Sequence, residues 1–497
     1  MSEASVFSQA VRREDDVGVS RYCRAMRLPE VLTFCLFVIA GTAAHAGPAA
    51  QVWVTSADAR QRLTRVADIP ITAAARDGLR IRVDPSRQYQ VVDGFGASFT
   101  ESSAWLMQQR MNESQRRELL RELFDPATGL GLSVTRIPIG ASDFSITHGT
   151  YDDVPAGETD PELARFSIDR ARPEVLPLLR EARRINPDLK VFISPWSAPA
   201  WMKTSGSLIT GRLDPKHYGA FARYFDKTIA AFEAEGVPIY AMTMQNEPHF
   251  EPWDYPGMRM EPAERAAFIR SHLGPMLASR WPKVKLFDWD HNWDQPESPL
   301  AVLADPEARK FVAGVAWHCY GGDVSAQSQI HAQHPDLETF MTECSGGDWE
   351  PDFNDSLSWM MQNLVIGNIR HWGRGAVLWN LALDEHSGPH LGGCGNCRGV
   401  VTILKDSGAV ARNVEYYVLG HASRFVKPGA RRIESDSDVD GLHTVAFRNP
   451  RGGAVLIVLN ASSARREFSV VVEQRGFPVT LEAGSVATVT WLLPAGH

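Results

Sequence analysis

The sequence predicts an α/β fold, a (β/α)8 TIM barrel with a discontinuous C-terminal β-sandwich, and three observations support it. From Val91 onward, short apolar runs alternate with amphipathic segments, which is the pattern of parallel strands joined by helices. Eight such runs are present, and eight strands close a barrel. After about Arg424 the helical spacing ends, and short strand-like runs follow that are separated by Gly, Pro, Asn and Ser.

The barrel elements alternate along the chain. The eight expected strands cover residues 94–99, 133–138, 190–195, 239–245, 284–289, 314–318, 339–343 and 376–380. The expected helices, several with Pro in the first turn, cover residues 113–123, 173–185, 215–235, 262–279 and 357–371. A doubly wound nucleotide-binding sheet is disfavoured, because Gly-Phe-Gly-Ala-Ser-Phe after Asp93 lacks the G-x-G-x-x-G spacing.

The β-sandwich is expected to draw strands from both ends of the chain. Strand patterns occur at residues 444–447, 454–459, 468–472 and 486–491. Residues 51–90 also alternate weakly, but they are too few to form a domain alone. We therefore expect residues 47–90 to complete a sandwich formed mainly by residues 424–497, with the catalytic barrel spanning residues 91–423.

The N-terminus has the pattern of a secretory signal peptide. The apolar run at residues 31–41 is too short to span a bilayer, follows three Arg within residues 21–27, and precedes the small-residue cleavage pattern Ala-His-Ala that ends at Ala46. The leader would be residues 1–46, and Met26 offers a second start that gives a more ordinary length. We expect a secreted or periplasmic protein with no membrane span after cleavage.

Charge and cysteine content restrict the partners. The formal charge of −8 and the pI of about 6.0 provide no basic field for nucleic acid, so we expect a neutral substrate. The mature chain keeps Cys319, Cys344, Cys394 and Cys397. A single C-x-x-C without a second pair or nearby paired histidines is a poor zinc site, so Cys394 and Cys397 form either a local disulfide or two free thiols. We expect no metal and no cofactor.

Two glutamates end two of the expected strands. Glu247 follows the apolar run Ile-Tyr-Ala-Met-Thr-Met-Gln-Asn, and Glu343 ends residues 338–343. The C-terminal ends of barrel strands face a common cavity, where paired carboxylates are the groups that glycoside hydrolysis needs. We interpret Glu343 as the nucleophile of a retaining glycosidase, held ionised by Arg136, His318 or Tyr320, and Glu247 as the acid/base.

Other strand ends carry side chains suited to a sugar. Tryptophan rings offer flat faces for the C–H faces of a pyranose, and polar groups fix its hydroxyls. Asn246 is placed to bond the 2-hydroxyl. The strand-end set comprises Arg136, Asp143, Trp196, Trp201, Asn246, Asp290, Trp293, His318, Tyr320, Trp379 and Asn380.

Eight motifs together resemble glycoside hydrolase family 30, and within it the acid glucosylceramidases. In chain order they are VDGFGASFTES, TRIPIGASDFS, FISPWSAPAWMKTSGSL, NEPH, HCY, TEC, WNLAL and GHASRFVKPGA. The resemblance implies a TIM barrel joined to a β-sandwich, with Glu247 as acid/base, Glu343 as nucleophile and no cofactor. It also implies a glycone pocket lined by Arg136, Asp143, Trp196, Asn246, His318, Tyr320 and Trp379.

The resemblance is weaker on the aglycone side. Residues 246–258, 287–296 and 391–399 do not look like the corresponding loops of the animal lysosomal enzyme. Glucose recognition is therefore better supported than ceramide recognition, and the β-glucoside substrate is a glycolipid or a glucan. We expect a glucosylceramidase-like activity, with endo-β-1,6-glucanase or another polysaccharide-acting member of the family as the alternative.

Two other classes of protein fit the sequence less well. A non-catalytic carbohydrate-binding barrel would keep the tryptophans but could lose a carboxylate, and both glutamates are present. A barrel metallohydrolase would need His-x-His at the end of the first strand, where this chain has Phe99-Thr100-Glu101.

Overall fold

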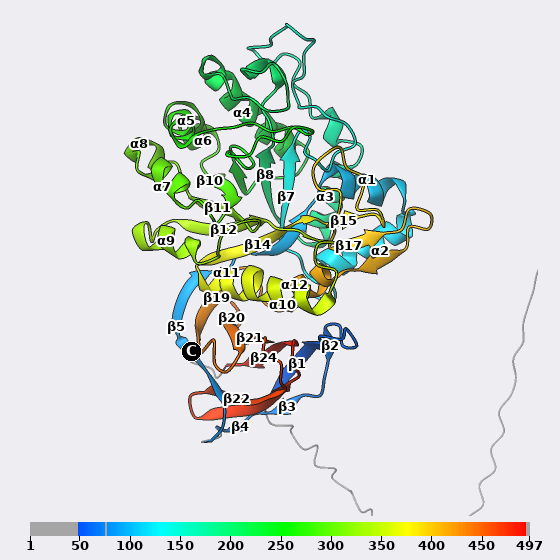
Figure 1. The fold of residues 1–497 in the computed structure, drawn as a ribbon, viewed down its shortest axis with the longest axis vertical. Helices are drawn as coiled ribbons and strands as arrows, with labels where there is room; N and C mark the ends of the chain where they lie inside the picture. The colour runs from blue at the N-terminus through cyan, green and yellow to red at the C-terminus, as the bar shows by residue number, and fades with distance from the viewer. Residues whose placement is uncertain (1–47, 75–76, 494–497) are drawn as a thin grey trace, which may run out of the picture. The chain divides into compact units, whose positions relative to one another are not determined.

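A computed structural model describes residues 48–74 and 77–493, so the expected signal peptide lies outside the described residues. Eight parallel strands form a closed barrel in the order β10-β11-β12-β14-β6-β7-β8-β9 (Figure 1). They are β6 (Gly94–Ser98), β7 (Val134–Ile139), β8 (Lys190–Pro195), β9 (Ala241–Thr243), β10 (Lys285–Asn292), β11 (Gly314–His318), β12 (Glu338–Glu343) and β14 (Gly373–Asn380). The expected TIM barrel is confirmed, and each expected strand overlaps one barrel strand.

The fourth barrel strand is shorter than expected. β9 ends at Thr243 instead of continuing to residue 245, because the chain turns out of the barrel wall. In that turn the N–H of Asn246 donates to the carbonyl of Pro195, and the N–H of Glu247 donates to the carbonyl of Asp290. Glu247 has a φ of 47°, a left-handed conformation that residues with a side chain rarely adopt. The turn fixes the position of Glu247 beyond the strand end.

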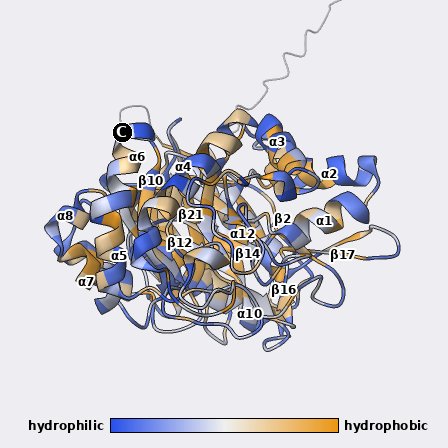
Figure 2. Cartoon of the chain, turned by 90° about the horizontal axis from the view of Figure 1, so that it is seen from above, coloured by the Kyte–Doolittle hydropathy of each residue, from blue (hydrophilic) through white to orange (hydrophobic). Residues whose placement is uncertain are grey.

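The barrel interior is packed with apolar side chains below the strand ends. Seven strands contribute one residue each: Val134, Phe192, Ala241, Phe287, Ala316, Phe340 and Val377. The Phe192 ring centroid lies 4.7 Å from that of Phe340 and 5.6 Å from that of Phe287. Figure 2 shows hydrophobic colouring concentrated in the middle of the molecule, around β12, β14 and β21, and a mixture of hydrophilic and hydrophobic colouring on the outer helices. The polar groups at the C-terminal strand ends therefore lie directly above a layer of apolar side chains.

Helices surround the strands, and two expected helices are interrupted. The helices are α1 (Glu101–Gln109), α2 (Glu113–Phe124), α3 (Val175–Ile185), α4 (Tyr218–Ala234), α5 (Pro262–Phe268), α6 (Gly274–Arg280), α7 (Glu297–Leu303), α8 (Pro306–Arg309), α9 (Ala326–Gln333), α10 (Phe353–Met360) and α11 (Asn368–Arg370). The π-helical segments η4 (Ile269–Leu273) and η5 (Met361–Gly367) interrupt the helices expected at residues 262–279 and 357–371. Pro275 explains η4, because proline lacks the N–H that a regular ladder needs.

The second domain is an eleven-stranded sheet with its own apolar core. Its longer strands are β1 (Ala49–Thr55), β5 (Arg80–Val91), β19 (Arg431–Ser435), β20 (Leu442–Arg448), β21 (Gly453–Asn460), β22 (Arg466–Val472), β23 (Arg475–Leu481) and β24 (Val486–Leu492). The short strands β2 (Thr64–Arg65), β3 (Ile69–Pro70) and β4 (Thr72–Ala73) complete it. Two of these strands, β19 and β23, were not expected from the sequence.

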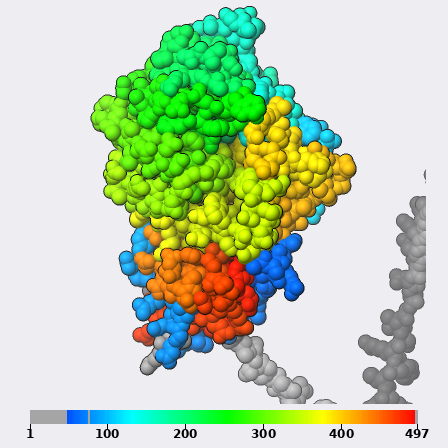
Figure 3. All heavy atoms as spheres, in the orientation of Figure 1, coloured from blue at the N-terminus to red at the C-terminus, as the bar shows by residue number. Residues whose placement is uncertain are grey.

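Both ends of the described chain contribute to this sheet. β1 pairs antiparallel with β24, from Gln51 opposite Thr490 to Thr55 opposite Val486. β5 pairs with β19 and, in parallel, with β22. Figure 3 shows the N-terminal segments in blue against the C-terminal segments in red. The sheet is thus discontinuous in sequence, as the fold class predicted.

A buried histidine joins the sheet to the barrel. His421, on α12 (Val414–Ser423), lies between the hydroxyls of Thr55 and Thr488, at 2.8 Å and 2.9 Å. It is fully buried.

No helix in the described part of the chain is both long and apolar enough to cross a bilayer.

Candidate active site

Arg136 is the central cation of the barrel mouth. It lies on β7 and is fully buried. One terminal nitrogen donates to Glu343 Oε2 at 2.6 Å, and the other donates to Asn246 Oδ1 and Asp290 Oδ2, both at 2.7 Å. Charge-assisted hydrogen bonds of this kind orient carboxylates firmly. Arg136 therefore holds the strand ends of β12, β9 and β10 in one constellation.

Asp290 is the buried anion that balances Arg136. Its Oδ2 also accepts from Ser194 at 2.8 Å and Thr243 at 2.6 Å, and its Oδ1 accepts from Thr342 at 2.6 Å. Burial would raise the pKa of Asp290, but Arg136 and then His318 hold it far below its usual range. Asp290 is therefore ionised and fully committed to partners within the protein.

His318 lies between two carboxylates. Its Nδ1 is 3.1 Å from Glu247 Oε1, and its Nε2 is 3.0 Å from Asp290 Oδ1. Both ring nitrogens face acceptors, and only the imidazolium can donate from both. Burial lowers the pKa of His318, but the negative charges of Glu343, Asp290 and Glu247 outweigh it and raise the pKa to about 9. His318 therefore carries a proton at neutral pH.

The two expected catalytic carboxylates approach the same imidazole. His318 Nδ1 is 3.1 Å from Glu247 Oε1 and 3.9 Å from Glu343 Oε1. Glu343 also accepts a hydrogen bond of 3.0 Å from the hydroxyl of Tyr320. Tyr320 is 45% exposed, although its hydroxyl reaches inward to Glu343. The two glutamates thus face one space from different strands.

The surroundings of the two carboxylates differ. Burial would raise the pKa of Glu247, but the nearby His291 imidazole and the hydrogen bond from His318 lower it below its ordinary value. Burial raises the pKa of Glu343, against the opposing charges of His318 and Arg136. Because both carboxylates contact the same imidazole, they and His318 titrate as one cluster.

Two stacked tryptophans form one wall of the site. Trp196 and Trp379 lie with ring centroids 4.9 Å apart and an interplanar angle of 17°. The Arg136 guanidinium carbon lies 4.7 Å from the Trp196 ring centroid and 5.6 Å from the Trp379 centroid. Phe144 and Cys397 pack against the same pair. The wall is flat and apolar, which suits the face of a sugar.

Asp143 faces the same space without a protein partner for one oxygen. It is buried, and among the described residues its Oδ1 has no hydrogen-bond partner. Burial, followed by the charges of Glu343 and Glu247, raises the pKa of Asp143 well above its usual range. A protonated Asp143 can donate to a ligand hydroxyl.

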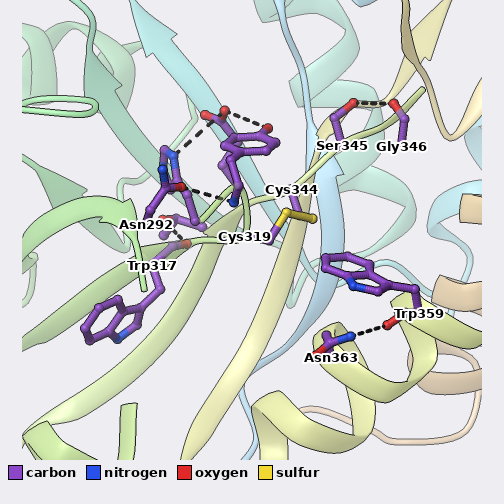
Figure 4. Close-up of a disulfide and its surroundings, with 12 residues drawn as sticks. Asn292, Trp317, Cys319, Cys344, Ser345, Gly346, Trp359 and Asn363 are labelled. Carbon is purple, nitrogen blue, oxygen red and sulfur yellow. Dashed lines mark hydrogen bonds and ion pairs between the residues drawn. A yellow bond between two sulfur atoms is a disulfide. The ribbon is translucent and has the colours of Figure 1, made fainter. Parts of the chain in front are cut away.

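Two disulfides brace the loops around the site. Cys319, next to Tyr320, is bonded to Cys344, next to Glu343, with an S–S distance of 1.93 Å (Figure 4). The sequence did not indicate this pair. Cys394 and Cys397 are bonded to each other at 2.09 Å. The second loop also pairs as β16 (Cys397–Arg398) with β13 (Gly346–Gly347), just after Glu343.

One triad of side chains has metal-like spacing. Glu247, His291 and His318 each place one potential ligand atom within 4.8 Å of the others. The same Glu247 oxygen already accepts from His318, and the other His318 nitrogen bonds Asp290. These hydrogen bonds account for the cluster, and we assign no metal to it.

The structure brings the nine expected site residues to one barrel mouth.

Three neighbours of these residues were given no role from the sequence. Asp290 stood out only as a polar strand end, and its inward position depends on a bulge in β10 and a φ of 54°. His291 lies 3.6 Å from Glu247 Oε1 and belongs to the same bulge. Tyr255 packs beside the tryptophan wall from the loop after Glu247. Trp201 instead donates to Asp152, as part of the packing.

The C-terminal mouth of this TIM barrel holds two facing glutamates beside an arginine and a tryptophan wall, which is the site of a glycoside hydrolase. The family model for the glycosyl hydrolase family 30 TIM-barrel domain matches residues 92–426. The model for the glycosyl hydrolase family 30 beta sandwich domain matches residues 429–489. The chain belongs to glycosyl hydrolase family 30.

Named relatives fall into two groups. An endo-1,6-beta-D-glucanase of Neurospora crassa is 33% identical over 469 residues, covering 90% of this chain and 95% of the relative. The lysosomal acid glucosylceramidase of Mus musculus is 31% identical over 441 residues, covering 83% and 84%. Among solved structures, the endo-beta1,6-glucanase BT3312 has a TM-score of 0.84 at 33% identity, covering 90% of this chain and 100% of that one.

Proposed function

We propose that the protein hydrolyses β-1,6-linked glucan by double displacement, with retention of the anomeric configuration. The observation that carries the proposal is the approach of Glu247 Oε1 and Glu343 Oε1 to one His318 nitrogen, while Tyr320 donates to Glu343 Oε1 and Arg136 donates to Glu343 Oε2. Retaining enzymes place two carboxyl groups about 5–5.5 Å apart. Contacts of 3.1 Å and 3.9 Å from one nitrogen to the two carboxylates are compatible with that separation.

Glu343 is the nucleophile of the first step. Arg136 and Tyr320 each bond one of its oxygens, which orients the carboxylate, and the charges of His318 and Arg136 oppose the rise in pKa that burial causes. It attacks the anomeric carbon, the glycosidic C–O bond breaks, and a glycosyl ester forms. Trp196 and Trp379 support the sugar ring, while Asn246 and Asp143 meet its hydroxyls.

Glu247 delivers the proton to the leaving oxygen. In the free protein this proton resides on His318, which has the higher pKa. Transfer across the 3.1 Å contact from Nδ1 to Glu247 Oε1 makes the acid available as the leaving oxygen arrives. In the second step water attacks the anomeric carbon, gives its proton to Glu247, and releases Glu343 as a carboxylate.

The glucan is preferred as substrate over a glycolipid. The Neurospora crassa relative and the solved structure BT3312 are both endo-β-1,6-glucanases, and each match covers 90% of this chain. Glucosylceramide is the second candidate, because the mouse glucosylceramidase shares 31% identity over most of its length. The order of the two substrates is the reverse of that expected from the sequence motifs.

A substrate panel tests the proposed function. Gentio-oligosaccharides, pustulan (a β-1,6-glucan), laminarin (a β-1,3-glucan) and glucosylceramide micelles are incubated with the mature protein, and the products are separated by chromatography. We expect kcat/KM on pustulan to exceed that on laminarin and glucosylceramide by at least about tenfold. Preferential release of ceramide would instead support the second candidate.

Export is part of the proposal. The apolar run at residues 31–41 and the small-residue pattern ending at Ala46 support a secreted or periplasmic protein that meets extracellular glucan. N-terminal sequencing of protein from the native host tests it, with a new terminus near Gly47 as the expected result.

A further inference from the structure

A second cavity opens beside the catalytic glutamates. It has a volume of about 690 Å³ and lies between the loop after Glu343 and helix α10. Binding clefts for small ligands have volumes of roughly 300–1,000 Å³. We call it the Trp349 groove; the residues that line it and carry the argument are Tyr320, Trp349, Glu350, Asp355, Trp359 and Gln362.

The groove adjoins the catalytic site at Tyr320. Tyr320 lines it and also bonds Glu343 through its hydroxyl, at 3.0 Å. Cys319 lines it as well, and its disulfide to Cys344 ties the Tyr320 loop to the Glu343 loop. Figure 4 shows this disulfide with Ser345, Gly346 and Trp359 around it. A glucan chain bound at the glutamates and extending past Tyr320 would therefore reach the groove.

Two tryptophans are left exposed where the groove runs. Trp349 is 53% exposed and Trp359 is 44% exposed. A tryptophan usually gains stability by burial, so two exposed rings along one cavity indicate a surface that binds a partner. A pyranose stacks its C–H face on such a ring without a specific hydrogen-bond pattern.

The Trp349 ring packs directly against the protein backbone beneath it. A Cβ on Gly347 would lie 2.0 Å from the Trp349 ring, so the indole rests directly on the glycine backbone. A Cβ on Gly346 would lie 2.1 Å from Glu415 Oε1, a buried carboxylate that accepts from Arg398 Nε at 2.9 Å. β13 and β16 pair across this support. The ring is therefore positioned before any ligand arrives.

The rim of the groove selects the class of ligand. Glu350, Asp355 and Gln362 stand among the tryptophans, and none of the described lining residues is basic. Carboxylates and amides accept or donate to hydroxyls, but carboxylates repel uronates and other anions. They also interrupt the apolar floor that an acyl chain would need. The lining fits a neutral polyhydroxylated chain.

We propose that the Trp349 groove is an accessory binding site for successive glucose residues of the glucan, with Trp349 and Trp359 as stacking platforms. The proposal rests on the proposed function and adds the residues that make the protein favour long chains. Each ring contributes when a glucose residue reaches it, so the benefit grows with chain length. The shortest substrates gain nothing from the groove.

The test compares chain lengths in defined variants. Trp349→Ala, Trp359→Ala and the double variant are assayed on nitrophenyl β-glucoside and on gentio-oligosaccharides of two to six residues. Leu492→Ala is the control, since it removes an 80% exposed apolar side chain from the distant sheet domain. Thermal melting excludes loss of folding, and Trp349→Phe tests whether a smaller ring restores binding.

We expect the loss in kcat/KM to increase with length, reaching about tenfold per tryptophan on the hexasaccharide and less than about threefold on the aryl glucoside. Leu492→Ala should match wild type on every substrate. An equal loss at all lengths, or no loss, overturns the groove proposal and leaves the proposed function standing. Failure of wild type to cleave any gentio-oligosaccharide overturns the proposed function and this occupant together.

Discussion

At the residue scale, the two glutamates are distinguished by their partners. Arg136 and Tyr320 bond opposite oxygens of Glu343, whereas Glu247 is hydrogen-bonded by the His318 imidazole. Replacing Glu343 by Gln should lower kcat on every substrate by about ten-thousandfold or more, because no glycosyl ester can form. Steady-state kinetics with aryl glucosides and pustulan measures the loss. Retention of more than about one per cent activity would contradict this role.

Replacing Glu247 by Ala should instead affect substrates selectively. Loss of a general acid costs about 10²- to 10⁴-fold on glucan, whose leaving oxygen needs a proton. A nitrophenolate leaves without one, so the ester should accumulate and added azide should release β-glucosyl azide. Mass spectrometry of the azide product is the measurement. The assignment would be contradicted if azide gave no β-glucosyl azide with Glu247→Ala, or if azide rescued Glu343→Gln in the same way.

The proton on His318 predicts the alkaline limb of the pH profile. Its pKa is raised to about 9, so the cluster keeps the proton below that pH and loses it above. Activity should therefore fall as pH rises through about 9 and should persist at pH 7. The profile of kcat/KM on a gentio-oligosaccharide reports this value. Glutamine cannot hold this proton, so the residual activity of His318→Gln should no longer decrease above about pH 9. If the decrease were unchanged in His318→Gln, His318 would not be the source of the proton.

At the element scale, strands were predictable where each carries its own local signal. The eight barrel runs combine apolar, β-prone residues with flanking turn residues, so they could be located individually. β19 reads Arg-Arg-Ile-Glu-Ser and was missed, because its place between β5 and β20 depends on long-range pairing. The π segments and the inward bulge of Asp290 likewise depend on packing between distant segments.

The strand β1 provides a test of the discontinuous sheet. Val52 is 3% exposed within the sheet core, whereas the next residue toward the N-terminus, Gln51, is exposed. Val52→Asp buries an unpaired charge and should lower the free energy of unfolding by about 3 kcal/mol or more. Gln51→Asp, the matched control, should change it by less than about 0.5 kcal/mol. Denaturant titration measures the free energy of unfolding of both variants. Equal losses in Val52→Asp and Gln51→Asp would place β1 outside the folded core.

At the scale of the whole molecule, His421 links the barrel to the sheet and should make stability depend on acid. Burial lowers its pKa to about 3, so the folded protein keeps it neutral while the unfolded chain takes up a proton below about pH 6.5. Its contribution is therefore complete above pH 6.5 and falls by up to about 1.4 kcal/mol per pH unit towards pH 3. His421→Asn should flatten this slope, and the exposed control His148→Asn should not. Identical slopes in all three proteins would contradict the account.

The central claim is double displacement by Glu343 and Glu247, and the stereochemistry of the first product tests it most directly. Proton NMR follows the anomeric signals during the first minutes of gentio-oligosaccharide hydrolysis, before mutarotation. We predict that the β-anomer appears first and the α-anomer only later, because two inversions restore the original configuration. An α-anomer appearing first would mean that water attacks directly, and would contradict the roles assigned to both glutamates.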